Sequence, residues 1–225
     1  MVRHSRRELN KRKCRARILK SSRKLFSTKG YENTTIEDVA QRPEVSKATL
    51  YNYFPNKESL LIGIAEEELD QIRHFIAHDL KNEADAAEKI RRVLEVFILD
   101  SIQYINLSRK ITYLNSCETS PLYATRMDMM AIFLELVLEA QKQEIFRSDL
   151  NPDDIVDIIM SVYLMAQFEW NDIDRYTPEF CCQKLNRILD IVLFNNLNDP
   201  LRIDFPGGIF LCVKQVRRTA HVLTI

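Results

Sequence analysis

A short run in the first quarter of the chain carries side chains that suit contact with nucleic acid. Lys47, Ala48, Thr49 and Asn52 stand within six positions of one another. Lysine and asparagine hydrogen-bond to base edges in the major groove of DNA. Threonine can bond to donors or acceptors on those edges, and alanine contacts the thymine methyl. For each polar residue the alternative is a solvated helix face or a helix cap. The run therefore predicts DNA contact, provided that its surroundings are positive and position it.

The charge of the chain is divided unevenly between its two ends. The totals are equal, with 32 Lys+Arg and 32 Asp+Glu. Residues 1–60 hold 15 basic and 6 acidic residues, a net charge of +9, and the remainder has a net charge of −9. Residues 3–24 contain eleven basic residues and one acid, Glu8. A solvated basic tail is the alternative, but this density suits phosphate contacts and counterion release, so we expect the N-terminal end to meet a polyanion.

Motifs for catalysis are absent from the sequence. It has no HExxH, GxSxG or Walker sequence, so no enzyme activity and no cofactor are predicted. Asp70, His74 and His78 share a helix face and could bind a metal or sense pH, yet they do not complete a metal site, and a solvated ion pair is favoured. The five cysteines form no CxxC pair and are odd in number, which indicates reduced thiols; they are Cys14, Cys117, Cys181, Cys182 and Cys212.

The composition favours a helical globular protein. Hydrophobic residues make up 46% of the 225 residues and charged residues 28%, while 4 Gly and 7 Pro leave few breakers for many strands. No apolar stretch approaches the roughly 18 to 20 residues that span a bilayer, and no apolar signal core follows the N-terminal charges. We therefore expect a cytoplasmic protein with no membrane partner.

Periodicity and breakers predict two helices in the basic part of the chain. Apolar residues at helical spacing predict the first over residues 13–28, ending at Gly30. Thr35 and Asp38 have the spacing of a capping box and begin the second. Pro43 ends it, because the residue before a proline is disfavoured in the helical region.

A third helix follows after a short turn. Ser46 is a natural N-cap for a helix through about Tyr53, with Leu50 and Phe54 facing inward. Two helices joined by such a turn and braced by a preceding helix form a helix-turn-helix, whose second helix fits the DNA major groove. This element would position the polar run and give the basic end a purpose.

The rest of the chain reads as a helical bundle. Asn56 can cap a long helix to about Lys81, and Pro152 and Pro178 stand at N1-like positions of two later helices. The last helix is apolar nearly all round, so we expect one face to pack on its own bundle and the other on a second subunit. The predicted later helices cover residues 85–106, 122–146, 152–170 and 178–197.

The helix-turn-helix region resembles the DNA-binding domain of TetR-type transcriptional regulators. With the preceding helix the resemblance covers about residues 15–61. It includes a glycine-aromatic turn, a Thr-Thr helix start, a Val-Ser-Lys start of the third helix, a Tyr-x-x-Phe and the lysine of the next helix. These features lie in GYENTTIEDVAQRPEVSKATLYNYFPNKESLL, residues 30–61.

The resemblance implies an all-α fold with about nine helices. A three-helix DNA-binding domain would precede a larger helical bundle for ligand binding and dimerisation. The expected division is a basic arm at residues 1–12, the helix-turn-helix domain at 13–61, the bundle at 62–198 and an irregular tail at 199–225. Within the tail, residues 209–213 could form a short strand.

The resemblance also assigns DNA contacts residue by residue. Base contacts map onto Lys47, Ala48 and Asn52. Phosphate contacts map onto Thr35, Ser46, Thr49, Tyr51, Tyr53 and Lys57. The chain departs from the family in its turn, where Pro43 and Glu44 replace the usual small residue and glycine. The basic arm, with Arg3, Arg6, Arg7, Lys11 and Arg12, could follow the backbone or enter a minor groove.

The larger domain would hold a ligand pocket of unknown chemistry. The candidate lining residues are Phe97, Tyr104, Tyr113, Phe133, Tyr163, Phe168 and Trp170; core packing is the alternative for most of them. Glu118, Glu169 and Asp172 could select a cationic ligand, although ordinary solvent exposure also explains them.

These features predict a homodimeric transcriptional regulator. It would bind a palindromic operator in double-stranded DNA as a repressor, and an unknown small-molecule effector would release it. The dimer would form through the last two helices. Two alternatives remain: an architectural DNA-binding dimer without a ligand, and a helical-bundle enzyme with an incidental basic arm.

Overall fold

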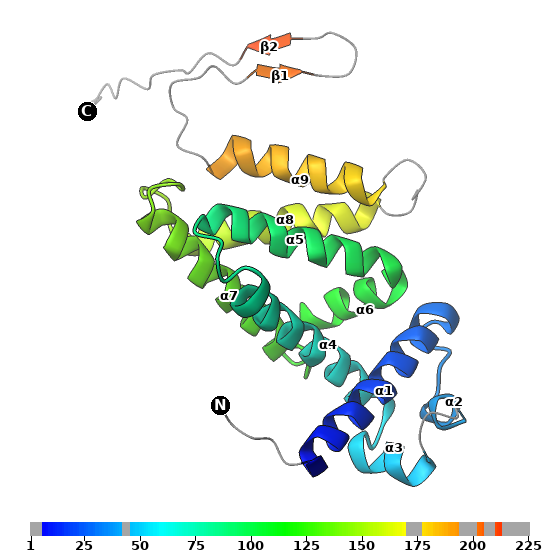
Figure 1. Cartoon of the computed structure of the whole chain (residues 1–225). Helices are drawn as coiled ribbons and strands as arrows, with labels where there is room; N and C mark the ends of the chain where they lie inside the picture. The colour runs from blue at the N-terminus through cyan, green and yellow to red at the C-terminus, as the bar shows by residue number, and fades with distance from the viewer. Residues whose placement is uncertain (1–5, 42–45, 170–176, 194–201, 205–209, 213–225) are drawn as a thin grey trace, which may run out of the picture.

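The computed structural model describes residues 6–41, 46–169, 177–193, 202–204 and 210–212, with backbone only for residues 168–169, 191–193 and the last two ranges. In these ranges the chain forms nine α-helices, one π-helical turn and one pair of short strands. The all-α prediction is confirmed. Helices α1, α2 and α3 gather at one end of the molecule, and α8 and α9 lie toward the other (Figure 1).

Four helices build the end of the molecule where the sequence predicts DNA contact, which we call the DNA-binding end. They are α1 (Arg6–Lys29), α2 (Ile36–Ala40), α3 (Lys47–Tyr53) and the first half of α4 (Lys57–His74). Gly30 has a φ of +85°, a left-handed conformation that glycine adopts without steric cost, and it ends α1 where the sequence predicts.

The start of α1 corrects the expected arm. The sequence predicts a basic arm at residues 1–12, but residues 6–12 form the first turns of α1. Residues 6–12 contain no glycine or proline, and their arginine, glutamate, leucine and lysine residues are good helix formers, so the helix can include them. Residues 1–5, including Arg3, lie outside the described residues.

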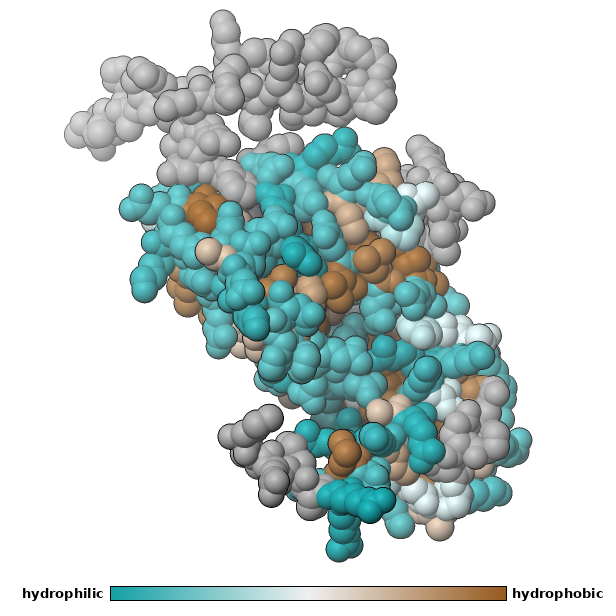
Figure 2. All heavy atoms as spheres, in the orientation of Figure 1, coloured by the Kyte–Doolittle hydropathy of each residue, from teal (hydrophilic) through white to brown (hydrophobic). Residues whose placement is uncertain are grey.

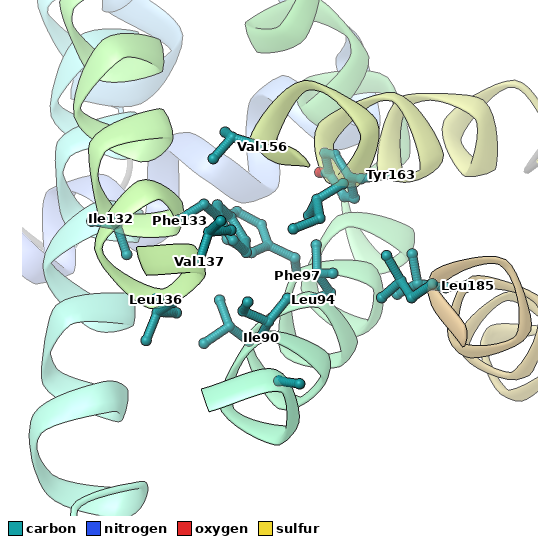
Figure 3. Close-up of a cluster of buried hydrophobic side chains, with 14 of the residues drawn as sticks. Ile90, Leu94, Phe97, Ile132, Phe133, Leu136, Val137, Val156, Tyr163 and Leu185 are labelled. Carbon is teal, nitrogen blue, oxygen red and sulfur yellow. The ribbon is translucent and has the colours of Figure 1, made fainter. Parts of the chain in front are cut away.

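The larger bundle continues α4 and adds five helices. A π-helical turn, η1 (Phe75–Asp79), extends α4. The bundle helices are α5 (Ala86–Gln103), α6 (Ile105–Asn115), α7 (Tyr123–Lys142), α8 (Pro152–Glu169) and α9 (Pro178–Leu193). Figure 3 shows side chains of α5, α7, α8 and α9 meeting in one core, where Phe97 of α5 lies between Phe133 of α7 and Tyr163 of α8. The ring centroids are 6.5 Å and 5.6 Å from Phe97.

Helix α6 is an element that the sequence reading missed. The prediction carried one helix to residue 106 and named none before residue 122. The chain instead bends at Tyr104, with φ −130° and ψ 43°, and a separate helix begins at Ile105. No side chain caps its N-terminus, so the start signal used for the other helices is missing here.

The two domains share helices rather than meeting at a clean boundary. The core of the DNA-binding end includes Leu60, Leu61, Ile64 and Ala65 of α4, and it also takes in Leu107 of α6. The expected boundary between residues 61 and 62 therefore falls inside a continuous helix. Movement of α4 or α6 would therefore change the packing of both cores.

The segment after α9 contains a short antiparallel pair of strands. They are β1 (Arg202–Asp204) and β2 (Phe210–Cys212), with Arg202 opposite Cys212. The strand at residues 210–212 lies within the stretch where one was predicted, but its partner was not predicted. No described helix is long and apolar enough to cross a membrane.

Candidate nucleic-acid interface and ligand cavity

Helix α3 is fixed at both ends and from below. Ser46 is its N-cap, with its hydroxyl accepting from the Thr49 backbone N–H at 3.2 Å. Leu50 is fully buried and Phe54, the C-cap residue, is 4% exposed. Because these two side chains anchor the inner face, the outer face is held toward solvent. Its exposed residues are Lys47, Ala48, Tyr51 and Asn52.

Helix α2 is held at its N-terminal end by a capping box and by a lysine of α1. The capping box that the sequence predicts is present, since Thr35 Oγ1 accepts from the Asp38 N–H and Asp38 accepts from the Thr35 N–H. Lys29 Nζ lies 2.7 Å from Asp38 Oδ2. The hydrogen bond from Lys29, together with those from Thr35, lowers the pKa of Asp38 to about 2. The box therefore stays charged and intact at neutral pH.

A tyrosine links α3 to α2. The Tyr51 hydroxyl donates to Glu37 Oε1 at 3.0 Å, and this hydrogen bond raises the pKa of the phenol. The contact orients Tyr51 along the exposed side of the helix pair. A DNA phosphate approaching the same hydroxyl would compete with Glu37 for its proton.

The first lysine of α4 contacts another residue of the same domain. Lys57 Nζ donates to the Tyr31 carbonyl at 2.9 Å and lies 4.3 Å from the centroid of the Tyr31 ring. Lys110 of α6 approaches the same ring and pairs with Glu32. The turn after α1 is thus held by one cation from α4 and one from α6.

A basic groove runs beside α3. It is lined by Arg7, Glu8, Asn10, Lys11, Arg12 and Arg15 of α1 together with Asn52 and Tyr53 of α3. The Tyr53 hydroxyl donates to the Lys11 carbonyl at 3.4 Å, which joins the two walls. Figure 2 shows hydrophilic residues over much of this end of the molecule. The groove brings the charge of the expected arm next to the exposed face of α3.

All nine residues expected to contact DNA belong to this end of the molecule. Thr35, Ser46, Lys47, Ala48, Tyr51 and Asn52 are exposed, whereas Thr49, Tyr53 and Lys57 are half-buried. Pro43 and Glu44, where the chain departs from the family turn, lie outside the described residues.

A cavity of about 140 Å³ opens between α4, α5, α6, α7 and α8. Two of the expected pocket residues line it, Phe97 and Tyr163. The Tyr163 and Ser101 hydroxyls are 2.7 Å apart, and burial raises the pKa of the phenol. The remaining wall is largely apolar and includes three thioethers, those of Met129, Met130 and Met160.

The other expected pocket residues lie away from the cavity or outside the described residues. Tyr104 packs on the core of the DNA-binding end, with the Arg23 guanidinium 5.6 Å from its ring centroid. Tyr113 is 73% exposed, and Phe133 is fully buried behind Phe97. Glu118 is exposed. The side chains of Phe168 and Glu169, and all of Trp170 and Asp172, lie outside the described residues.

Glu68 is a cavity residue that the sequence reading did not select. It lies on α4 and lines the cavity. Burial, and to a smaller extent the nearby Asp100, raises the pKa of Glu68 to about 7, while Arg23 acts in the opposite direction. The sequence contains a pattern that could have identified Glu68, because this carboxylate falls midway between Ile64 and Ile72 on the apolar stripe of α4.

Helix α6 lies between the cavity and the DNA-binding end. Leu107, Ile111 and Leu114 pack on the core of that end. Ser108, Thr112 and Asn115 line the cavity, and Ile111 contributes to both. The main chain of α8 is also tied to α6, because Arg109 donates to the Gln167 carbonyl at 2.6 Å.

The histidine pair on α4 and η1 forms a stack rather than a metal site. The His74 and His78 rings are 4.2 Å apart, and Asp70 pairs with Arg73 at 3.7 Å. In the part of the chain that the structure describes, no group of three or more His, Cys, Asp or Glu residues is arranged to hold a metal ion.

The sequence matches a known family over its DNA-binding end. Residues 18–64 match the family described as bacterial regulatory proteins, tetR family. The HTH-type transcriptional activator FasR of Mycolicibacterium smegmatis is 24% identical over 113 residues, covering 50% of this chain and 51% of FasR. The negative regulator of the icaADBC biofilm operon of Staphylococcus epidermidis, IcaR, is 31% identical over 107 residues, covering 44% and 56%. The chain thus spans about half the length of these relatives.

Solved structures with the same fold cover most of the chain. FadR of Thermus thermophilus, a TetR-family repressor in complex with lauroyl-CoA, superposes with a TM-score of 0.56. The two sequences are 21% identical, and the match covers 79% of this chain and 92% of FadR. At this identity the likeness establishes the fold, including the nine-helix arrangement.

Proposed function

We propose, since residues 18–64 form a DNA-binding domain of the tetR family, that the protein is a homodimeric regulator that represses transcription until a small molecule releases it. The observation that carries the proposal is the exposed polar face of α3, flanked by the basic groove. Lys47, Ala48 and Asn52 would read base edges.

The phosphate contacts would fix the register of α3. We assign them to Thr35, Ser46, Thr49, Tyr51, Tyr53 and Lys57. The basic groove adds Arg7, Lys11 and Arg12, whose charges extend the phosphate track beyond α3. Lys57 would act through its charge at the start of α4, because its ammonium is already bonded to Tyr31.

The dimer would form through α8 and α9. Met165 of α8 is 57% exposed and Phe180 of α9 is 39% exposed. A small pocket between the two helices is lined by apolar residues including Val162, Ala166 and Leu185. Exposed apolar side chains on adjacent helices favour a covered interface. Two copies of α3 related by the dimer axis would enter successive major grooves about 34 to 36 Å apart.

The effector would bind in the cavity and act through α4 and α6. Both helices line the cavity and also pack in the core of the DNA-binding end. A ligand that fits the cavity better when the two copies of α3 are wrongly spaced would lower operator affinity, because it would shift the population toward that state. The structural relative FadR binds lauroyl-CoA, which is a precedent for an effector in this fold.

Operator binding by the variant Lys47→Ala/Tyr51→Ala tests the proposal. Loss of the Lys47 base contact costs about 1–3 kcal/mol, so operator affinity should fall at least about fivefold relative to random DNA. Loss of the Tyr51 phosphate contact should weaken binding to the operator and to random DNA alike. The matched control is Lys142→Ala, which removes an exposed lysine from the far end of α7. Unchanged operator affinity in the double variant would refute the role of α3. Equal affinity of the wild type for all duplexes would point instead to an architectural DNA binder.

A further inference from the structure

We propose that the cavity takes a compact amphipathic organic cation, an apolar body with one ammonium group, which reaches Glu68 along an acidic groove. The inference rests on the proposed function, because it names the chemical class of the effector. It is carried by the charges around the cavity and by the residues that form its wall.

The acidic groove lies between α4, η1 and α5. It is lined by five carboxylates, those of Glu67, Glu68, Asp70, Asp79 and Asp100. Glu68 and Phe97 line both this groove and the inner cavity, so the two spaces share one wall. A groove of one sign with low-dielectric walls raises the local concentration of ions of the opposite sign.

The neighbouring cations leave this site negative. Arg23 of α1 lies 3.4 Å from Asp100 and 3.8 Å from Glu67. Arg73 is shared between Asp70 and Asp128. No described hydrogen bond or ion pair joins Glu68 to a cationic side chain. The remaining charged wall residue, Arg126 of α7, is half-buried.

The inner wall suits the apolar part of such a ligand. The rings of Phe97 and Tyr163 can accept a cation on their faces, and the thioethers of the three cavity methionines adapt to irregular shapes. At about 140 Å³ the cavity is close to the size of an engineered apolar cavity that binds benzene. The ligand body is therefore expected to be about one ring in size.

The carboxyl group of Glu68 makes cation binding depend on pH. Its pKa of about 7 means that it is partly protonated in neutral solution. The groups that act on Glu68 are Asp100 of α5, Arg23 of α1 and Tyr163 of α8, and Arg126 of α7 lines the same cavity. A bound cation favours the ionised carboxylate, so affinity should rise as the pH increases from 6 to 8.

Three probes with the same phenylethyl body but different charge test the inference on the full chain by calorimetry. They are phenethylammonium, 2-phenylethanol and 3-phenylpropanoate. At pH 8 phenethylammonium should bind at least about tenfold more tightly than the alcohol, and the anion should bind most weakly. Glu68→Gln should remove the preference and its pH dependence without changing alcohol binding. Glu58→Gln, at an exposed position of α4, is the matched control.

Other outcomes overturn the inference. Tightest binding of 3-phenylpropanoate, lost in Arg126→Gln, would identify an anionic effector instead. Equal binding of all three probes, or binding of none, would leave Glu68 without a selecting role. Operator affinity measured in parallel separates the two proposals: if the cation binds through Glu68 without changing operator affinity, the inference stands and the effector role of the cavity fails.

Discussion

Substituting Gly63 with alanine tests how helix α3 is anchored. Gly63 lies on α4 and is buried. An alanine Cβ there would lie 2.7 Å from Phe54 Cε1 and 3.1 Å from Leu19 Cδ2. Contacts of about 3.4 Å or more are ordinary, so the Phe54 ring would have to withdraw by about 0.7 Å. Phe54 is the C-cap residue of α3, and the displacement would be passed to that helix.

The expected change in the free energy of unfolding follows from two opposing effects. Replacing glycine by alanine in a helix stabilises it by about 1 kcal/mol. Overpacking a filled core costs about 1–3 kcal/mol. The substitution should therefore destabilise the protein by about 1 kcal/mol, which corresponds to a fall of about 2–4 °C in Tm for a chain of this size. Operator affinity should fall as well, because α3 is displaced.

Urea unfolding and an operator shift assay measure both effects. Gln71→Ala, at an exposed position of the same helix, is the control for helix propensity. Phe54→Leu makes room at the contact, so it should be less harmful in the Gly63→Ala background than alone. An alanine variant that is about 1 kcal/mol more stable than the wild type would refute the reasoning, since it would mean that the site at residue 63 is open.

Three further predictions concern the groove, α6 and the capping box. Arg7→Ala/Arg12→Ala removes two proposed phosphate contacts per subunit, so the slope of log K against log salt should fall by about 3.6 for a dimer; an unchanged slope would leave the groove without a role. Leu107→Ala removes a side chain that is 2% exposed and should lower the free energy of unfolding by about 2–5 kcal/mol in urea titrations, whereas a loss under 1 kcal/mol would show that α6 does not hold the DNA-binding end. The pKa of Asp38 is depressed to about 2, so its contribution to stability is present above pH 4 and is lost as the pH falls toward 2; Asp38→Asn should flatten this part of the stability curve, and an identical curve would contradict it.

The helices of the DNA-binding end could be predicted because their signals are local. Thr35, Ser46 and Asn56 cap α2, α3 and α4 as their sequence contexts predict, and Gly30 adopts the left-handed conformation that ends α1. Helix α6 was not predicted from the sequence because no side chain caps its N-terminus at Tyr104. Its apolar residues have helical spacing, yet that spacing alone does not mark where one helix stops and the next begins.

The cavity was harder to predict because its wall comes from five helices. An aromatic residue such as Tyr113 or Phe133 looks the same in the sequence whether its side chain lines a cavity, fills the core or faces solvent. Only the packing of the helices against one another distinguishes these cases. Glu68 is different, since a carboxylate on the apolar face of a helix is visible in sequence, and removing even part of it from water costs free energy.

Selection of bound duplexes from a random DNA pool by the full-length protein tests the central claim most directly. If two copies of α3 read successive major grooves, the enriched sequences will converge on one short palindrome whose half-site centres lie about 10 base pairs apart. Enrichment of no sequence, or of a single site without two-fold symmetry, would contradict the account.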